Sequence, residues 1–503
     1  MMDTAAVGAP DVVVVGGGAA GCVVAARLSE DPDCRVVLLE AGPDLRTSAP
    51  DEVRVGWQPT RTFDWGYTSE PDELGVARPL PRGRLLGGCS STNATFALRG
   101  SPADYDAWAG RGNAGWSFDD VLPTFRKLER DLDFGDRPWH GSSGPVPIRR
   151  YGPDELTDVA TAGLAAFEDV GITHVEDHNA PGAVGAGLVP VNCLDGIRMS
   201  TALTYLPRPG ERPNLDVRCE AEVLDLVIQG SRATGVRLGS GEVVHAGCVV
   251  LCAGTYGSPP LLLRSGIGPA ADLRALGIAI HADLPGVGAN LADHPAVAIG
   301  LSYRKEPSPA PLFQVVATLH SSAAARDDAP DLQLMAFGPY ASSGESPSTF
   351  MVAAALLKPH SRGRVTLRPE LPGGAPRIDL CYLVEPADLD RLDQGLELAE
   401  SVADHPGVRA LCAAGPHGAA ERSGRDDRRT WMRRTCWTYH HPVGTCSMGP
   451  ASDPAAVVDD RGRVHRIDGL RVADASVMPD VPSANTHIPT LMVAERLAEL
   501  LRG

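Results

Sequence analysis

The chain has 503 residues, of which 43% are hydrophobic and 22% are charged, and its formal net charge is −17. A chain of this length is too long for one ordinary hydrophobic core, so it predicts two domains or one large elaborated fold. The negative charge argues against nucleic acid as the main partner, because the phosphate backbone would be repelled.

The cellular location is predicted from the N-terminal segment, the apolar runs and the cysteines. The first ten residues have neither the basic start nor the apolar stretch of a signal peptide, and no uncharged apolar run approaches the length of a membrane span. The eleven cysteines include no CxxC pair and no regular spacing, so we expect no disulfide framework. These features predict a cytoplasmic protein with no integral membrane segment.

The first forty residues have the pattern of one β-α-β unit. A buried strand over 12–15 leads into the glycine-rich turn 16–21, a helical pattern follows, and a second strand over 35–39 ends on Glu40. The turn has the spacing GxGxxG, in which successive glycines permit a tight turn, let the backbone approach a pyrophosphate and let the helix pack closely on the strand. Glu40 is placed to accept hydrogen bonds from a ribose. An acidic residue here selects against a 2′-phosphate, so the turn predicts a site for NAD or FAD.

Three later segments complete the order of elements. Residues 223–251 alternate strand-like segments with turn signals and predict an antiparallel meander of three or four strands. Residues 302–350 are richer in Pro, Ser and Ala, and we interpret them as part of a second domain that carries variable loops. The C-terminal segment predicts a strand over 470–474, a loop to Pro489 and an amphipathic helix, with Pro489 in the first turn where its missing N–H does no harm.

Motifs spread over nearly the whole chain resemble those of the glucose–methanol–choline (GMC) oxidoreductases. They are GRLLGGCSSTN over 83–93, GTYGSPPLLLRSGIG over 254–268, GVGANLADH over 286–294, HPVGT over 441–445 and GLRVADAS over 469–476. The resemblance implies an α/β fold with an α+β second domain: a Rossmann-like FAD-binding domain and a discontinuous substrate-binding domain built on an antiparallel sheet. We place the FAD-binding domain at 8–148, 200–297 and 446–503, and the substrate-binding domain at 149–199 and 298–445.

The resemblance and the glycine-rich loops together predict the residues that contact FAD. They are Gly16, Gly18, Ala19, Ala20, Glu40, Ala41, Arg84, Gly87, Gly88, Ser91, Asn93, Ala94, Thr95, Val223, Ala253, Gly254, Asp474, Ala475, His487, Pro489 and Thr490. Some family members carry a histidine that binds the flavin covalently at the position of Thr92. A threonine cannot form that bond, so we expect non-covalent FAD.

Two histidines are the predicted catalytic residues. Alcohol oxidation removes a hydride from carbon, which flavin N5 can accept, and a proton from the hydroxyl group, which the protein must accept. By resemblance to the HPxGT motif, His441 is the base, a task that suits a side chain with a pKa near neutrality. His487 occupies the position of the family's second His or Asn and is expected to hydrogen-bond the substrate oxygen. We expect His440 and Tyr439 to line the substrate pocket, although the ring of His440 could equally point away into packing.

The predicted activity is FAD-dependent oxidation of a small-molecule alcohol, primary by analogy with the family. The electrons pass to O2, a quinone or a redox carrier, and the motifs do not distinguish an oxidase from a dehydrogenase. The alternative is an enzyme of the same fold that resembles the FAD-containing hydroxynitrile lyases and carries out no net redox reaction. We expect no metal site, because no cluster with ligand spacing occurs and the adjacent His440 and His441 cannot easily share one ion.

Overall fold

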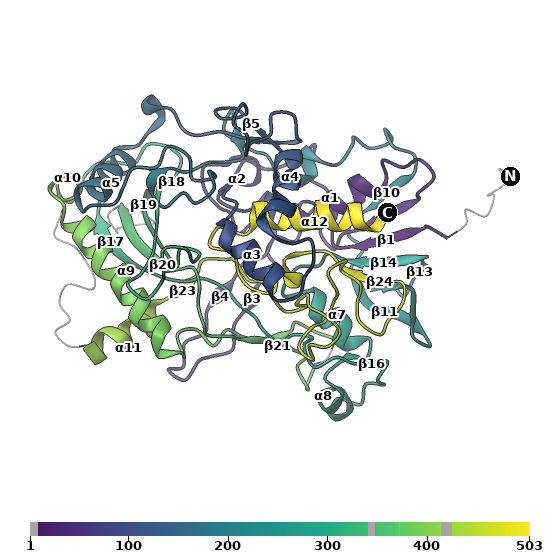
Figure 1. The fold of residues 1–503 in the computed structure, drawn as a ribbon. Helices are drawn as coiled ribbons and strands as arrows, with labels where there is room; N and C mark the ends of the chain where they lie inside the picture. The colour runs from purple at the N-terminus through teal and green to yellow at the C-terminus, as the bar shows by residue number, and fades with distance from the viewer. Residues whose placement is uncertain (1–8, 341–347, 372, 414–424, 503) are drawn as a thin grey trace.

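The computed structural model describes residues 9–340, 348–371, 373–413 and 425–502. A five-stranded parallel sheet lies near both chain termini, and a six-stranded antiparallel sheet lies at the other end of the molecule (Figure 1). This arrangement confirms the predicted class, an α/β unit of Rossmann type combined with an α+β part built on an antiparallel sheet. The boundaries drawn above stay a prediction, and the one between residues 297 and 298 falls inside an antiparallel strand, β17.

The parallel sheet joins segments from both ends of the chain. Its strand order is β10 (Leu215–Arg218), β2 (Val36–Leu39), β1 (Val12–Val15), β14 (Cys248–Leu251) and β24 (Leu470–Val472). All neighbouring strands run parallel. Every residue of β1 and β2 is buried, as expected for strands whose two faces are both covered.

The predicted meander is correct for three strands and wrong for a fourth. The strands β11 (Val223–Gln229), β12 (Arg232–Leu238) and β13 (Val243–His245) form an antiparallel sheet. The next segment, β14, pairs instead with β1. Its sequence CVVL carries apolar side chains toward both faces, which suits a central parallel strand and not a meander with one face in water.

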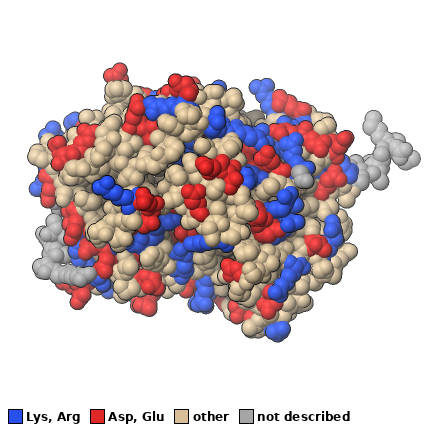
Figure 2. Space-filling view, viewed as in Figure 1, with Lys and Arg blue, Asp and Glu red and all other residues tan. Residues whose placement is uncertain are grey.

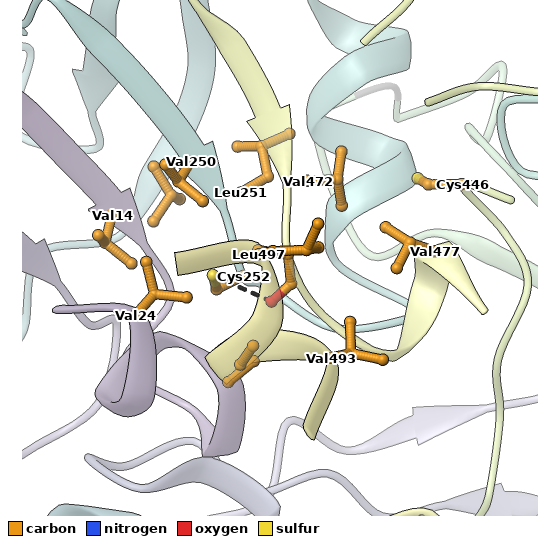
Figure 3. Close-up of a cluster of buried hydrophobic side chains, with 14 of the residues drawn as sticks. Val14, Val24, Val250, Leu251, Cys252, Cys446, Val472, Val477, Val493 and Leu497 are labelled. Carbon is orange, nitrogen blue, oxygen red and sulfur yellow. Dashed lines mark hydrogen bonds between the residues drawn. The ribbon is translucent and has the colours of Figure 1, made fainter. Parts of the chain in front are cut away.

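Two helices from opposite ends of the chain pack against each other over this sheet. They are α1 (Ala19–Leu28) and α12 (His487–Arg502). Figure 3 shows Val24 of α1 and Val493 of α12 in one cluster with Val14 and Val250 of the sheet. Helix α12 begins two residues before Pro489, which therefore lies in its first turn as predicted. Because α12 is anchored in this core, the position of its first residue, His487, is fixed relative to the parallel sheet.

The antiparallel sheet provides the second layer. Its order is β23 (Trp437–Thr438), β17 (Pro295–Ser302), β20 (Thr349–Leu356), β19 (Leu332–Tyr340), β18 (Phe313–Leu319) and β7 (Gly185–Leu188). The segment 302–350, which we interpreted as weakly patterned and loop-bearing, contributes two long regular strands. Their residues are buried on both faces, so they lack the polar alternation that identifies a half-exposed strand.

The two faces of this sheet have different neighbours. Helices α5 (Asp158–Asp169) and α9 (Pro386–Asp404) pack on one face against side chains such as Leu334 and Val352. Alternate residues point to the opposite face, since successive side chains of a strand project in opposite directions. Gly300, Met335 and Met351 lie on that opposite face and line a cavity.

The remaining elements connect these layers. The other helices are α2 (Asp51–Arg54), α3 (Pro102–Gly110), α4 (Phe118–Leu128), α6 (Thr201–Thr204), α7 (Ser258–Arg264), α8 (Ala270–Ala275), α10 (Pro406–Arg409) and α11 (Arg425–Thr435), with 3-10 turns at Gly88–Ser91, Pro153–Glu155 and Ala475–Val477. Short strand pairs are β3 (Tyr67–Thr68) with β4 (Pro79–Leu80), β5 (Glu129–Asp131) with β6 (Val146–Ile148), β8 (Cys193–Leu194) with β9 (Ile197–Arg198), β15 (Ile267–Gly268) with β16 (Ala282–Asp283), and β21 (Arg364–Thr366) with β22 (Arg377–Asp379).

The face of the molecule shown in Figure 2 carries charges of both signs. Acidic and basic side chains are interspersed on the face shown in Figure 2, and no basic area comparable to a nucleic-acid groove is visible there. All eleven cysteines are free thiols. Within the described ranges, no helix has both the length and the apolar character needed to cross a membrane.

Candidate active site

A cavity of about 800 Å³ lies between the carboxyl ends of the parallel strands and the inner face of the antiparallel sheet. Most of the residues predicted from the sequence line it, although they come from segments hundreds of residues apart. They are Gly16, Gly18, Ala19, Ala20, Glu40, Ala41, Gly88, Asn93, Ala94, Val223, Ala253, Gly254, Asp474, Ala475, His487, Thr490, Tyr439, His440 and His441.

Five predicted residues lie beside the cavity instead of on its wall. Arg84 forms an ion pair with Glu222 at 3.1 Å and lines a neighbouring pocket of about 610 Å³. The others support the loops behind the wall: Gly87 donates its N–H to Gly17 O at 2.7 Å, Ser91 Oγ donates to Leu86 O at 3.0 Å, Thr95 Oγ1 donates to Gly56 O at 3.3 Å, and Pro489 is buried in α12.

The glycine-rich turn forms one wall from backbone alone. Gly16 has φ +96°, and a Cβ atom on Gly21 would lie 1.9 Å from the Gly16 oxygen, so both positions require glycine. Gly88 has φ +51° and lies against Gly18 across the wall, where a Cβ would meet Gly18 Cα at 2.7 Å. Helix α1 starts at Ala19 with no side-chain cap, so its first N–H groups and its positive end are free for a phosphate.

Glu40 carries a buried carboxylate at the end of β2. Its Oε2 accepts the Gly17 N–H and its Oε1 accepts the Gly42 N–H, each at 2.8 Å. Burial raises the pKa of Glu40 to about 7, and the backbone hydrogen bonds oppose that rise. A carboxylate accepts more than two hydrogen bonds, so Glu40 retains capacity for ribose hydroxyl groups.

Asp474 fixes the backbone at the ends of β14 and β24. Its carboxylate accepts Gly254 N–H at 2.8 Å, Ser258 Oγ–H at 2.6 Å and Ser476 Oγ–H at 2.5 Å. Gly254 has φ +78°, and no atom lies within 4 Å of the position of a Cβ there. The backbone is therefore held open to the cavity. Together with the glycine turn and Glu40, this open backbone fits a flavin dinucleotide.

His441 follows β23 and lies at the end of the cavity formed by the antiparallel sheet. Hydrogen bonds hold both of its ring nitrogens. Its Nε2 accepts from Asn485 Nδ2 at 3.1 Å, and its Nδ1 lies 3.0 Å from Nδ1 of His294. Because Nε2 accepts a hydrogen bond, the proton of the neutral ring is on Nδ1, and Nδ1–H donates to His294. This tautomer leaves the lone pair of Nε2 on the side of Asn485, and His441 and Asn485 both line the cavity.

Asp293 holds the backbone that carries His441. Its Oδ1 accepts the N–H of His441 at 2.8 Å, and its Oδ2 accepts the hydroxyl groups of Tyr382 and Thr438 at 2.5 Å each. His440 between these contacts has φ +69°, an unfavourable conformation for a residue with a Cβ that persists only where the surroundings enforce it. Asp293 thus ties the start of β17 to the turn that presents the base.

The three other predicted active-site residues also face the cavity. His487 is the first residue of α12, and its Nε2 lies 3.3 Å from Asn192 Nδ2. Tyr439 places its ring centroid 4.4 Å from that of His441. The His440 side chain is exposed to the cavity, so of the two orientations left open by the sequence the structure has the one facing the pocket.

Burial keeps this group of histidines neutral. It lowers the pKa of His294 to about 3 and that of His487 to about 4. The pKa of His441 is lowered well below its usual range, first by burial and then by the neighbouring His294, His440 and Arg82. His441 is therefore neutral at physiological pH and its Nε2 lone pair carries no proton, although its pKa is not near neutrality as the sequence led us to expect.

Several residues of the site were not predicted. His294 and Asp293 belong to a recognised motif, and Asn485 lies two residues before His487, but nothing in the sequence indicates that they meet His441. Arg82, whose guanidinium donates to His440 O at 3.1 Å, immediately precedes the GRLLGG stretch. The apolar side chains that the antiparallel sheet brings to the cavity give no sequence signal, because apolar residues in strands are more often core.

A separate buried cluster of ionisable residues lies in β5 and the segment after it. Ligand atoms of Glu129, Asp131 and His140 lie within 4.8 Å of one another. Arg99 forms an ion pair with Glu129, and Arg150 pairs with Asp131 at 2.5 Å. These guanidinium groups already neutralise the carboxylates, so we interpret the cluster as a structural ion-pair network.

Comparisons with known proteins found relatives that match over nearly the whole chain. Two family models described as GMC oxidoreductase match residues 10–296 and 359–494. The chain is 38% identical to a 5-(hydroxymethyl)furfural oxidase from a Methylovorus species, with 98% of each chain covered. It is 34% identical to an oxygen-dependent choline dehydrogenase of Sinorhizobium medicae, covering 98% of this chain and 95% of that protein. The crystal structure of pyridoxine 4-oxidase from Mesorbium loti matches with a TM-score of 0.89 and 32% identity, covering 97% and 98% of the two chains.

Proposed function

Because the chain belongs to the GMC oxidoreductase family and is an FAD-dependent alcohol oxidoreductase, we propose that it oxidises a primary alcohol to the aldehyde with His441 as the base. The observation that carries the proposal is the arrangement of His441, a buried neutral imidazole at the cavity whose Nε2 is held as a hydrogen-bond acceptor.

The residues that would hold FAD are those of the glycine turn, Glu40, and the backbone around Gly254. When bound, FAD supplies the acceptor for the hydride that leaves the alcohol carbon. The free N–H groups of α1 would bind its pyrophosphate, and Glu40 its ribose. We propose that this binding is non-covalent, since Thr92, which lines the cavity, offers no imidazole for a covalent bond.

His441 would accept the hydroxyl proton at Nε2. In the neutral tautomer described above, Nδ1–H is fixed by His294, so the lone pair that must accept the proton is on Nε2. The Asn485 amide now bonded to Nε2 can turn to the substrate oxygen when the hydroxyl takes its place. General-base catalysis of this kind contributes on the order of 10²- to 10⁴-fold.

His487 would hold the substrate oxygen as negative charge develops on it. It begins α12, and the positive end of that helix stabilises charge in the same region. The contact with Asn192 at 3.3 Å fixes the orientation of its ring. Tyr439 and His440 would form the wall next to the reacting carbon.

The test is an anaerobic titration of the FAD-loaded protein with a panel of primary alcohols, followed at the visible flavin band. Bleaching would establish transfer of electrons from the alcohol, and admission of air would then separate an oxidase from an enzyme that needs a quinone or a redox carrier. No bleaching with any alcohol, with flavin bound and a His441→Ala variant behaving like the wild type, would overturn the proposal and favour the lyase-like alternative.

A further inference from the structure

We propose that the substrate is an uncharged aromatic primary alcohol, whose ring packs on the inner face of the antiparallel sheet in a space kept open by Gly300. This inference rests on the proposed function and names the substrate class of the same site. It is carried by three separate features of the cavity: the side chains of its sheet wall, the distribution of charge around it, and the free volume at one glycine.

Aromatic rings cover one part of the sheet wall. Phe313 stacks on Phe337 with ring centroids 4.8 Å apart, Phe96 lies edge-on to Phe313 at 5.4 Å, and Tyr340 lies edge-on to Phe337 at 6.0 Å. All four line the cavity. Rings that already pair in these geometries extend readily to one more ring, because stacked and edge-on contacts are the preferred arrangements of aromatic groups.

The apolar wall continues up to the catalytic base. Met335 and Met351 line the cavity beside Phe337, and thioethers make favourable contacts with aromatic rings. The Tyr439 hydroxyl lies 2.8 Å from Met335 Sδ, while its ring centroid is 4.4 Å from that of His441. A ring that packs on this wall therefore directs a substituent such as a hydroxymethyl group toward His441.

The charges around the cavity disfavour a cationic substrate. Among the described residues that line it, the carboxylates are Glu40, Glu222 and Asp474. Each is engaged at the parallel-sheet side: Glu40 with backbone amides, Glu222 with Arg84, and Asp474 with Gly254 and two serines.

Of the three described arginines that line the cavity, Arg264 belongs to α7, whereas Arg61 and Arg82 lie near His440. Arg82 donates to His440 O at 3.1 Å, and both Arg82 and Arg61 line the cavity. An aromatic wall can also bind a quaternary ammonium group. Here two guanidinium charges would oppose such a cation. The nearby carboxylate of Asp293 is buried behind the wall and engaged with Tyr382, Thr438 and the His441 N–H, so it is not available to a cation in the cavity.

Gly300 provides the space for the ring. It lies in β17 opposite Met351 of β20, on the cavity side of the sheet, and no atom lies within 4 Å of the position of its Cβ. Its φ is not in the left-handed region, so the backbone does not demand glycine there. The neighbouring inward residue of β17, Ala298, is also small. We infer that the small side chains set the width of the substrate space.

The experiment compares the FAD-loaded wild type with Gly300→Leu, using benzyl alcohol, 4-methoxybenzyl alcohol, ethanol, hexan-1-ol and choline as substrates. For the wild type, we expect kcat/KM to be highest with the benzyl alcohols and choline to be inactive. Gly300→Leu should raise KM for the benzyl alcohols by about tenfold or more and change that for ethanol by less than about threefold, since the added side chain excludes only the larger group. Gly110→Leu is the matched control, because Gly110 also has open space at its Cβ but lies at the end of α3, away from the cavity.

The outcomes separate the two proposals. Turnover of aliphatic alcohols or choline in preference to benzyl alcohols would overturn the substrate class while leaving alcohol oxidation in place. Equal losses for ethanol and benzyl alcohol in Gly300→Leu, with flavin content unchanged, would overturn the role of Gly300. Absence of flavin bleaching with every alcohol would overturn the proposed function itself.

Discussion

Nδ1 of His441 lies 3.0 Å from Nδ1 of His294, a residue 147 positions away that is completely buried. Only one of the two nitrogens can carry the shared proton. Because Nε2 of His441 accepts from Asn485, that proton is on Nδ1 of His441 and His294 is its acceptor. His294 does not line the cavity, and we therefore assign it as a positioning residue for the base.

Replacement of His294 should impair catalysis more than substrate binding. In His294→Leu the ring of His441 loses its acceptor, and we expect kcat to fall by about 10- to 100-fold, a loss typical of a misplaced catalytic group, with little change in KM. His294→Gln retains an acceptor oxygen and should recover part of the rate. Steady-state kinetics over a range of pH measures this. Equal activity of the Leu and Gln variants would contradict a positioning role.

Removal of the base itself should have a larger effect. His441→Ala should lower kcat/KM by on the order of 10²- to 10⁴-fold, because the substitution removes the proposed proton acceptor. The flavin content per chain, measured after release of the cofactor, should stay that of the wild type. A variant that keeps flavin and full activity would exclude His441 as the base.

Glu40 should control affinity for the cofactor and not the chemistry. Glu40→Gln retains the shape but loses the charge that accepts the amide and ribose hydrogen bonds. We expect FAD to bind about tenfold more weakly, the equivalent of one charged hydrogen bond. Fluorescence titration of the flavin-free protein measures the Kd. At saturating FAD, kcat should be close to that of the wild type, and a large fall in kcat would contradict this assignment.

The flavin should be released by acid. Because Thr92 occupies the position where some family members carry the covalently attached histidine, precipitation with acid should leave intact FAD in the supernatant. Flavin that stays with the precipitated protein would show a covalent bond and refute the expectation.

Stability should fall on the acid side of neutrality. The folded-state pKa of His294 is lowered to about 3 from 6.5, so the unfolded chain binds the proton more readily. The contribution of neutral His294 to the free energy of unfolding is fully present above pH 6.5. It is lost as the pH falls from there toward about 3, by about 1.4 kcal/mol per pH unit for one such histidine.

Chemical unfolding between pH 6.5 and 5 measures this slope, since most carboxylates remain ionised there. His294→Gln, which cannot titrate, should give a shallower dependence than the wild type. Parallel slopes for the two proteins would show that His294 does not contribute.

Short sequence patterns were enough to predict the end of the cavity where we propose that FAD binds. These patterns are glycines at positions that only glycine can occupy, an acidic residue directly after the second strand, and a proline in the first turn of a helix. Such signals depend on backbone geometry over a few residues, so Gly16, Gly21 and Glu40 are recognisable before the chain folds.

The arrangement at the substrate end of the cavity depends on long-range packing. The separation of β14 from the meander depends on which strand it pairs with, and the inward face of the antiparallel sheet depends on strand register. The contact of His441 with His294 joins residues far apart in the sequence, and an aromatic substrate wall has the same composition as an ordinary core. Short-range patterns cannot encode these relationships, because they exist only after long-range packing brings the segments together.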